Sequence, residues 1–141
     1  MIPSLPQITA IQSYLRENAR GQYESVAVLP FTLFFHPADP FPYFNYAIPD
    51  AACSEKDLEP VLEGIVTEFQ RRGRPPRFDF FEQFAPALPS ALEAAGFTEP
   101  GRQWSMICTP ATLQPAPEVP GLELVALHPE SPSEEIRDYL L

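Results

Sequence analysis

A chain of 141 residues with 45% hydrophobic content is long enough for a single globular domain with a sizeable core. Its 19 acidic residues against 9 lysines and arginines give a net charge of −10, which disfavours nucleic acid and anionic membranes as partners. The sequence has no apolar run near the ~20 residues of a membrane span and no visible signal peptide, so we expect a cytoplasmic protein without membrane contact.

The first elements that the sequence predicts are a helix and strands. Residues Gln7 to Ala19 place apolar side chains at helical spacing, and Gly21 follows where a C-terminal cap belongs. Residues 25–35 are rich in Val, Phe and Leu, which predicts a strand or a hairpin arm with Pro30 at an edge or bulge. After a proline-rich loop, residues 43–48 predict another strand.

A longer amphipathic helix is predicted from Asp57 to Arg72. Its apolar stripe follows an i, i+3, i+4, i+7 pattern through Leu58, Val61, Leu62, Ile65, Val66 and Phe69. We expect Asp57 rather than Ser54 to be the N-cap, because this choice places Pro60 in the first turn, where its missing N–H matters little. Gly73 is expected to end the helix.

The second half of the chain predicts shorter elements, namely a strand at 77–81, a helix at 86–95 that ends at Gly96, and a strand at 103–108. Residues 110–120 are rich in proline and predict a linker, and residues 122–127 predict one more strand. A final helix begins with well-formed capping signals after Ser131. This start favours a chain that is the front portion of a larger protein, and the alternative is a short C-terminal helix docked on the core.

From Tyr43 to Pro110, about half of the chain, the order of strands and helices resembles the GNAT superfamily of N-acetyltransferases. The segments that carry the resemblance are Arg74-Pro75-Pro76-Arg77-Phe78-Asp79-Phe80, Ala91-Leu92-Glu93-Ala94-Ala95-Gly96-Phe97, Met106-Ile107-Cys108-Thr109-Pro110 and Val119-Pro120-Gly121-Leu122-Glu123. The last two, with the proline-rich linker between them, resemble the junction of tandem GNAT proteins. In those proteins a degenerate first half precedes a catalytic second half.

The resemblance implies a fold class and a domain organisation. The expected fold is α/β, a twisted mixed sheet of about five or six strands flanked by helices. The expected divisions are a degenerate GNAT-like domain at 1–110, a proline-rich linker at 111–120, and the start of a second GNAT-like unit or a C-terminal extension at 121–141.

Two departures from the family pattern argue against catalysis by this chain alone. The family grips the acetyl-CoA pyrophosphate with a basic, glycine-rich loop that opens its main helix. The equivalent turn here has Pro49, which offers no N–H, and acids that repel phosphate, namely Asp50, Glu55 and Asp57. Leu92 stands where many members have a tyrosine general acid. We therefore assign no catalytic, cofactor-binding or metal-binding residue, and we expect acetyl-CoA, the family's cofactor, not to bind this chain.

The first functional hypothesis is a non-catalytic GNAT-like half that packs on a catalytic acetyltransferase half and shapes its acceptor-amine site. Its partner is then that catalytic half or a second subunit. One alternative is a stand-alone structural or binding module that dimerises through an aromatic face. The other is an active N-acetyltransferase with an atypical cofactor loop, which transfers acetyl from acetyl-CoA to an amine.

Two groups of side chains are candidate contact sites. The basic cluster, a candidate contact for an anion or a partner, consists of Arg71, Arg72, Arg74 and Arg77. Its simpler interpretation is charge complementation at the negative end of a helix. The aromatic group is expected to be mostly core and partly an exposed surface for a partner, and it consists of Phe31, Leu33, Phe34, Phe35, Phe41, Tyr43, Phe44 and Tyr46.

Three further pairs are weak candidates for chemistry: Asp79 with Glu82, His36 with His128, and Cys53 with Cys108. The carboxylates stand three residues apart and project to opposite faces of a strand. The histidines have no neighbours at metal-ligand spacing. The cysteines are expected to be ordinary buried thiols rather than a disulfide or a nucleophile.

Overall fold

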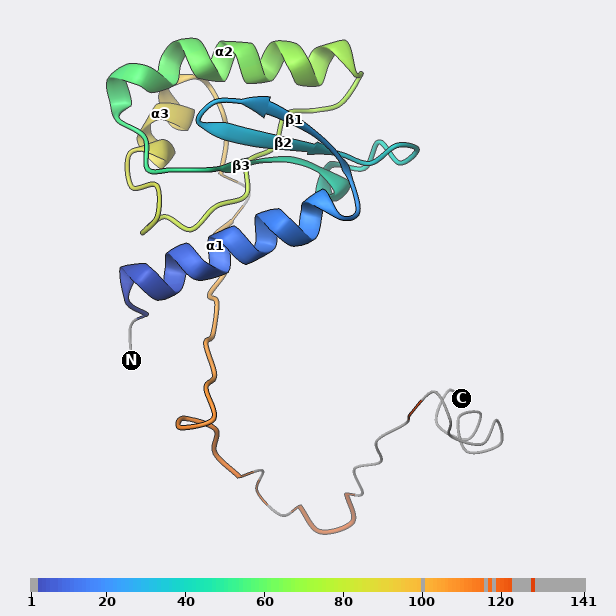
Figure 1. Ribbon diagram of the computed structural model, residues 1–141, viewed down its shortest axis with the longest axis vertical. Coiled ribbons are helices and arrows are strands. Elements are labelled where there is room, and N and C mark those ends of the chain that lie inside the picture. Colours follow the sequence, from blue (N-terminus) through green and yellow to red (C-terminus); the bar gives the residue numbers. More distant parts are fainter. Residues whose placement is uncertain (1–2, 100, 116, 118, 123–127, 129–141) are drawn as a thin grey trace. The chain divides into compact units, whose positions relative to one another are not determined.

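The described part of the chain combines three α-helices with three strands (Figure 1). This computed structural model describes residues 3–99, 101–115, 117, 119–122 and 128. The chain divides into two units, Met1–Ser105 and Met106–Leu141, and every helix and strand that the structure describes lies in the first. In this described part, no helix is both long enough and apolar enough to cross a membrane.

The sheet is antiparallel, with its strands in the order β1 (Glu24–Val28), β2 (Phe31–Phe35) and β3 (Asn45–Pro49). The central strand β2 is buried along its whole length, and its Leu33 lies opposite Val26 of β1 and Ala47 of β3. The helices are α1 (Leu5–Arg20), α2 (Glu55–Arg71) and α3 (Leu88–Ala94). Figure 1 shows α1 on one face of the sheet, and α2 on the other face with α3 beside it.

Alternation along β2 gives the sheet two apolar faces, because successive side chains of a strand point to opposite sides. The larger core joins the odd positions of β2 to the apolar stripe of α2, and includes Phe31, Leu33, Phe35, Leu58, Leu62, Ile65 and Phe69. The smaller core lies on the other face and consists of Ala19, Phe34 and Ile48, with Tyr23 and Tyr46 packed against it. The two helical layers are therefore held by residues of one buried strand.

The expected mixed sheet of about five or six strands is wrong for the described residues, which form three antiparallel strands. In place of a strand at 77–81 there is a single parallel bridge between Phe78 and Ala47. The prolines at 75 and 76 restrict the chain before the bridge and donate no ladder hydrogen bond. The segment 103–108 also forms no strand, and its Trp104 and Met106 are almost fully exposed. Its β-prone composition lacks the hydrogen-bonded neighbour that a strand requires.

Several helix and strand boundaries also differ from the expected ones. The N-cap of α2 is Ser54 rather than Asp57, so Pro60 lies inside the helix. Pro30 is not part of a strand, because it lies between β1 and β2 in the hairpin turn. Gly96 follows α3 with a φ of 84°, as expected of a glycine that ends a helix. The strand expected at 122–127, apart from its first residue, and the helix expected after Ser131 lie outside the described residues.

Candidate functional site

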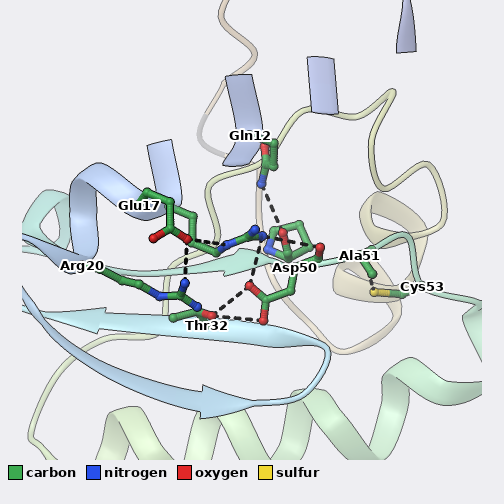
Figure 2. A network of polar contacts seen from close by, with 9 residues as sticks. Gln12, Glu17, Arg20, Thr32, Asp50, Ala51 and Cys53 are labelled. Carbon is green, nitrogen blue, oxygen red and sulfur yellow. Dashed lines mark hydrogen bonds and ion pairs between the residues drawn. The ribbon is translucent and has the colours of Figure 1, made fainter. Parts of the chain in front are cut away.

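The turn between β3 and α2 is tied to α1 by a polar network (Figure 2). The Asp50 carboxylate accepts the Thr32 hydroxyl at 2.8 and 3.0 Å, and Arg16 Nη1 lies 3.2 Å from Asp50 Oδ1. The side chains of Arg16 and Asp50 are only 16% and 22% exposed, so this ion pair is largely shielded from water. Gln12, which is buried, donates to the Pro49 carbonyl at 3.4 Å.

This network changes the electrostatic argument about the turn. The sequence suggests that Asp50 repels phosphate at the start of α2, but the Arg16 guanidinium offsets much of its charge. Pro49 closes β3 and offers no N–H, as expected. The side chains of Glu55 and Asp57 lie outside the described residues. That this chain does not bind acetyl-CoA thus stays a prediction, and its support is now Pro49 and the absence of a glycine in the turn.

Arg71 and Arg77, two members of the basic cluster, already have carboxylate partners in the first unit. Arg71 pairs with Glu68 at 2.9 Å on the exposed surface of α2, and this hydrogen bond holds the pKa of Glu68 below its ordinary value. Arg77 pairs with Asp79 at 2.9 Å, and its guanidinium lies 4.1 Å from the centroid of the Tyr43 ring. These arginines act as charge partners and, for Arg77, as a cation stacked on an aromatic face.

The remaining two arginines line a small pocket of about 160 Å³, whose walls are Glu24, Phe35, His36, Pro37, Arg72 and Arg74. Arg72 follows the last residue of α2, and its guanidinium lies 4.5 Å from the centroid of the Phe35 ring. It forms ion pairs with Glu68 and, at 2.6 Å, with Glu24. Stacking and ion pairing together fix the position of this guanidinium.

Arg74 differs from the other three because both of its hydrogen bonds go to neutral oxygens. It donates to Asn45 Oδ1 at 3.3 Å and to the Arg72 carbonyl at 3.4 Å, and among the described residues it forms no ion pair. His36 Nδ1 accepts the backbone N–H groups of Ala38 and Asp39 at 3.2 and 2.8 Å. The neutral imidazole therefore carries its proton on Nε2, as a donor.

Three exposed aromatic residues form what we call the aromatic patch, namely Phe41, Tyr43 and Phe44. Their exposed fractions are 53%, 59% and 39%. The ring centroid of Phe41 lies 5.3 Å from that of Tyr43 and 6.0 Å from that of Phe44. The other members of the aromatic group are buried or partly buried, as the sequence predicts. In the smaller core, burial raises the pKa of Tyr46 to about 12.

Asn45 fixes the loop that carries the aromatic patch. This side chain is fully buried, and its Nδ2 donates to the carbonyls of Asp39 and Phe41 at 2.9 and 2.8 Å. Its Oδ1 accepts the His36 N–H at 3.1 Å as well as the contact from Arg74. One side chain thereby connects the loop, the pocket and the start of β3.

Asp79 and Glu82, the weak candidate pair of carboxylates, have separate partners. Asp79 pairs with Arg77, whereas Glu82 lies 3.5 Å from Arg102. The expectation of buried thiols is wrong, because Cys53 is partly exposed and Cys108 is exposed, and neither takes part in a disulfide. Within the described ranges, no group of three or more His, Cys, Asp or Glu side chains is arranged to hold a metal ion.

Neither the Arg16–Asp50 pair nor the role of Asn45 was predicted from the sequence. Gln12 and Arg16 stand four residues apart on the sheet-facing side of α1, where polar residues interrupt the apolar stripe, and this interruption was the available signal. Asn45 carries no such local signal. Comparison with protein-family models, with curated proteins and with solved structures gave no match. The resemblance to GNAT proteins accordingly stays a prediction from the sequence.

Proposed function

We propose that the described fold is a non-catalytic module that binds a second domain or subunit through the aromatic patch. The observation that carries this proposal is the group of three exposed aromatic rings, in which Phe41 contacts both Tyr43 and Phe44 and the Arg77 guanidinium is stacked on Tyr43. Aromatic residues and arginine are the residue types that dominate the energetics of protein interfaces.

The loop geometry supports binding with a small entropic cost. Asn45 holds the backbone of the loop through its contacts with His36, Asp39 and Phe41. A binding surface that is ordered before association loses less conformational freedom on binding. Each aromatic ring that a partner covers also removes apolar area from water, at roughly 25 cal/mol per Å².

The sequence resemblance supports a particular partner, the catalytic half of a GNAT-type N-acetyltransferase. In this proposal the module acts in the cytoplasm and shapes the acceptor-amine site, while the catalytic half binds acetyl-CoA. A second candidate, favoured by the same patch, is a stand-alone module that dimerises through it.

Isothermal titration of acetyl-CoA into the 141-residue chain tests the non-catalytic part of the proposal. We expect no saturable heat from protein whose circular dichroism shows it to be folded. Saturable binding at micromolar concentration would overturn the proposal and favour an active acetyltransferase with an atypical cofactor loop.

Sedimentation velocity tests the role of the patch and separates the two partners. The samples are the native chain, a Phe41→Ser/Tyr43→Ser variant, and a control with Tyr14→Ser at an exposed tyrosine of α1. If the native chain and the Tyr14→Ser control are dimers and the patch variant is a monomer, the result supports the stand-alone module. A monomer that binds a separately produced catalytic half of a GNAT-type N-acetyltransferase supports the tandem enzyme. A native chain that does neither contradicts the docking proposal.

A further inference from the structure

We propose that the pocket between Arg72, Arg74 and His36 binds an oxyanion, a carboxylate or a phosphate group, and that Glu24 is an internal competitor for Arg72. This goes beyond docking through the aromatic patch, because it concerns a different set of side chains and a ligand that the isolated chain binds. The pocket, of about 160 Å³, has room for several water molecules, and hence for one such group.

Arg74 supplies the unmatched positive charge of the pocket. Within the described part of the chain it forms no ion pair, and its hydrogen bonds to Asn45 and to the Arg72 carbonyl fix its position without neutralising it. A guanidinium presents planar N–H donors that match the two oxygens of a carboxylate or phosphate. His36 also lines the pocket, and because its Nδ1 accepts two backbone N–H groups, Nε2–H is the donor that the ring has left for a ligand.

Arg72 supplies a second guanidinium whose partners differ in exposure. The side chains of Arg72 and Glu68 are each 18% exposed, so this ion pair is largely shielded from water and holds Arg72 in place at the pocket wall. Glu24 is 58% exposed and reaches Arg72 across 48 residues of sequence at 2.6 Å. Because more than half of the Glu24 side chain is exposed, its carboxylate is solvated, so an incoming anion can replace it at a smaller cost than it could replace Glu68.

Charge complementation at the helix end does not account for the whole arrangement. The negative end of α2 explains arginines at positions 71 and 72, and its carbonyl groups weigh against a bound anion. Arg74 lies beyond the helix and turns to Asn45 and the pocket instead. Among the described wall residues of the pocket, Glu24 is the one carboxylate, so its removal leaves Arg74, the His36 imidazole and Arg72, which keeps its ion pair with Glu68.

The test is an ¹H–¹⁵N NMR titration of the full chain with inorganic phosphate and, separately, with acetate. We expect saturable shifts at His36 and at the Arg74 Nε–H. Arg74→Gln should weaken binding about tenfold, the equivalent of one charge-assisted hydrogen bond. Glu24→Gln should tighten binding about threefold, because it removes an exposed competitor. The control Arg71→Gln, at an arginine outside the pocket, should leave affinity within about twofold of native.

The two titrations also identify the source of the ligand. Tighter binding of phosphate supports a phosphate-bearing ligand, and tighter binding of acetate supports a carboxylate. The proposal is overturned if neither anion gives saturable shifts with a folded spectrum, or if Arg74→Gln binds as well as the native chain. Weaker binding by Glu24→Gln, from protein whose spectrum shows it to be folded, would also overturn it.

Discussion

Replacing Arg16 by methionine should destabilise the fold by much more than replacing Arg20. Arg16→Met keeps a long side chain against the sheet but removes the charge that lies 3.2 Å from Asp50 Oδ1. Asp50 is then left with the Thr32 hydroxyl as its side-chain partner, in a site that is mostly shielded from water. The substitution therefore leaves a largely buried carboxylate without a positively charged partner.

The size of the effect follows from the burial of the pair. Removing one partner of a fully buried ion pair costs roughly 3–5 kcal/mol, whereas exposed pairs contribute about 0.2–1 kcal/mol. Arg16 Nε is buried without a hydrogen-bond partner, which offsets part of the stabilisation that the native pair provides. We therefore expect Arg16→Met to lower the free energy of unfolding by about 2 kcal/mol.

Urea denaturation followed by circular dichroism measures this free energy. The matched control is Arg20→Met on the same helix, because Arg20 pairs with Glu17 at 2.6 Å while 45% and 61% of the two side chains are exposed. Its cost should stay below about 0.5 kcal/mol. A double-mutant cycle with Asp50→Asn should return a coupling free energy of about 1–2 kcal/mol between positions 16 and 50.

Two results would refute the reasoning. Equal losses for Arg16→Met and Arg20→Met would mean that burial does not strengthen the first pair. Strict additivity in the cycle would mean that Arg16 stabilises the fold through its alkyl chain rather than through Asp50.

Three further predictions concern single positions. Gly96→Val should lower the free energy of unfolding by about 1–2 kcal/mol, because the φ of 84° at this position is unfavourable for a residue with a side chain. Gly21→Ala, at a φ of −75°, should be tolerated. Asn45→Ala should lower the free energy of unfolding by about 2–3 kcal/mol, because two loop carbonyls lose their hydrogen-bond donor. It should also speed hydrogen exchange in residues 36–44, and unchanged exchange would mean that Asn45 does not hold the loop. Burial raises the pKa of Tyr46 from about 10 in the unfolded chain to about 12, so its contribution to stability is present below pH ~10 and is lost as pH rises towards 12. Urea unfolding across this pH range should show that Tyr46→Phe loses less free energy of unfolding than the native chain does.

The periodicity of apolar residues predicted those elements whose buried faces are encoded within a single stretch of sequence. The stripe from Leu58 to Phe69 located α2. The Val- and Phe-rich run at 25–35 located β-structure, but it was expected to be one strand or hairpin arm and holds both strands of a hairpin. The prediction of Asp57 as N-cap was wrong because it rested only on the energetic cost of a proline inside the helix. The structure keeps Pro60 inside the helix, in the turn between the buried Leu58 and Leu62.

Long-range pairing explains what the sequence analysis did not predict. The segment 103–108 has the composition of a strand, but composition does not supply a neighbouring strand. The basic cluster was recognised from adjacent arginines. Its division into a pocket and a stacking site depends on Glu24 and Tyr43, which come from distant parts of the chain.

The way in which Asn45 holds the loop has a consequence for how recognition by this fold can vary. Its hydrogen bonds reach only backbone atoms of the loop, at His36, Asp39 and Phe41, so they are independent of the side chains that the loop displays. Positions 41, 43 and 44 can thus accept other residues while the path of the chain is kept. A library randomised at these three positions, with Asn45 retained, would yield variants of shared architecture and different binding preference, which makes this loop a natural grafting site for new specificities.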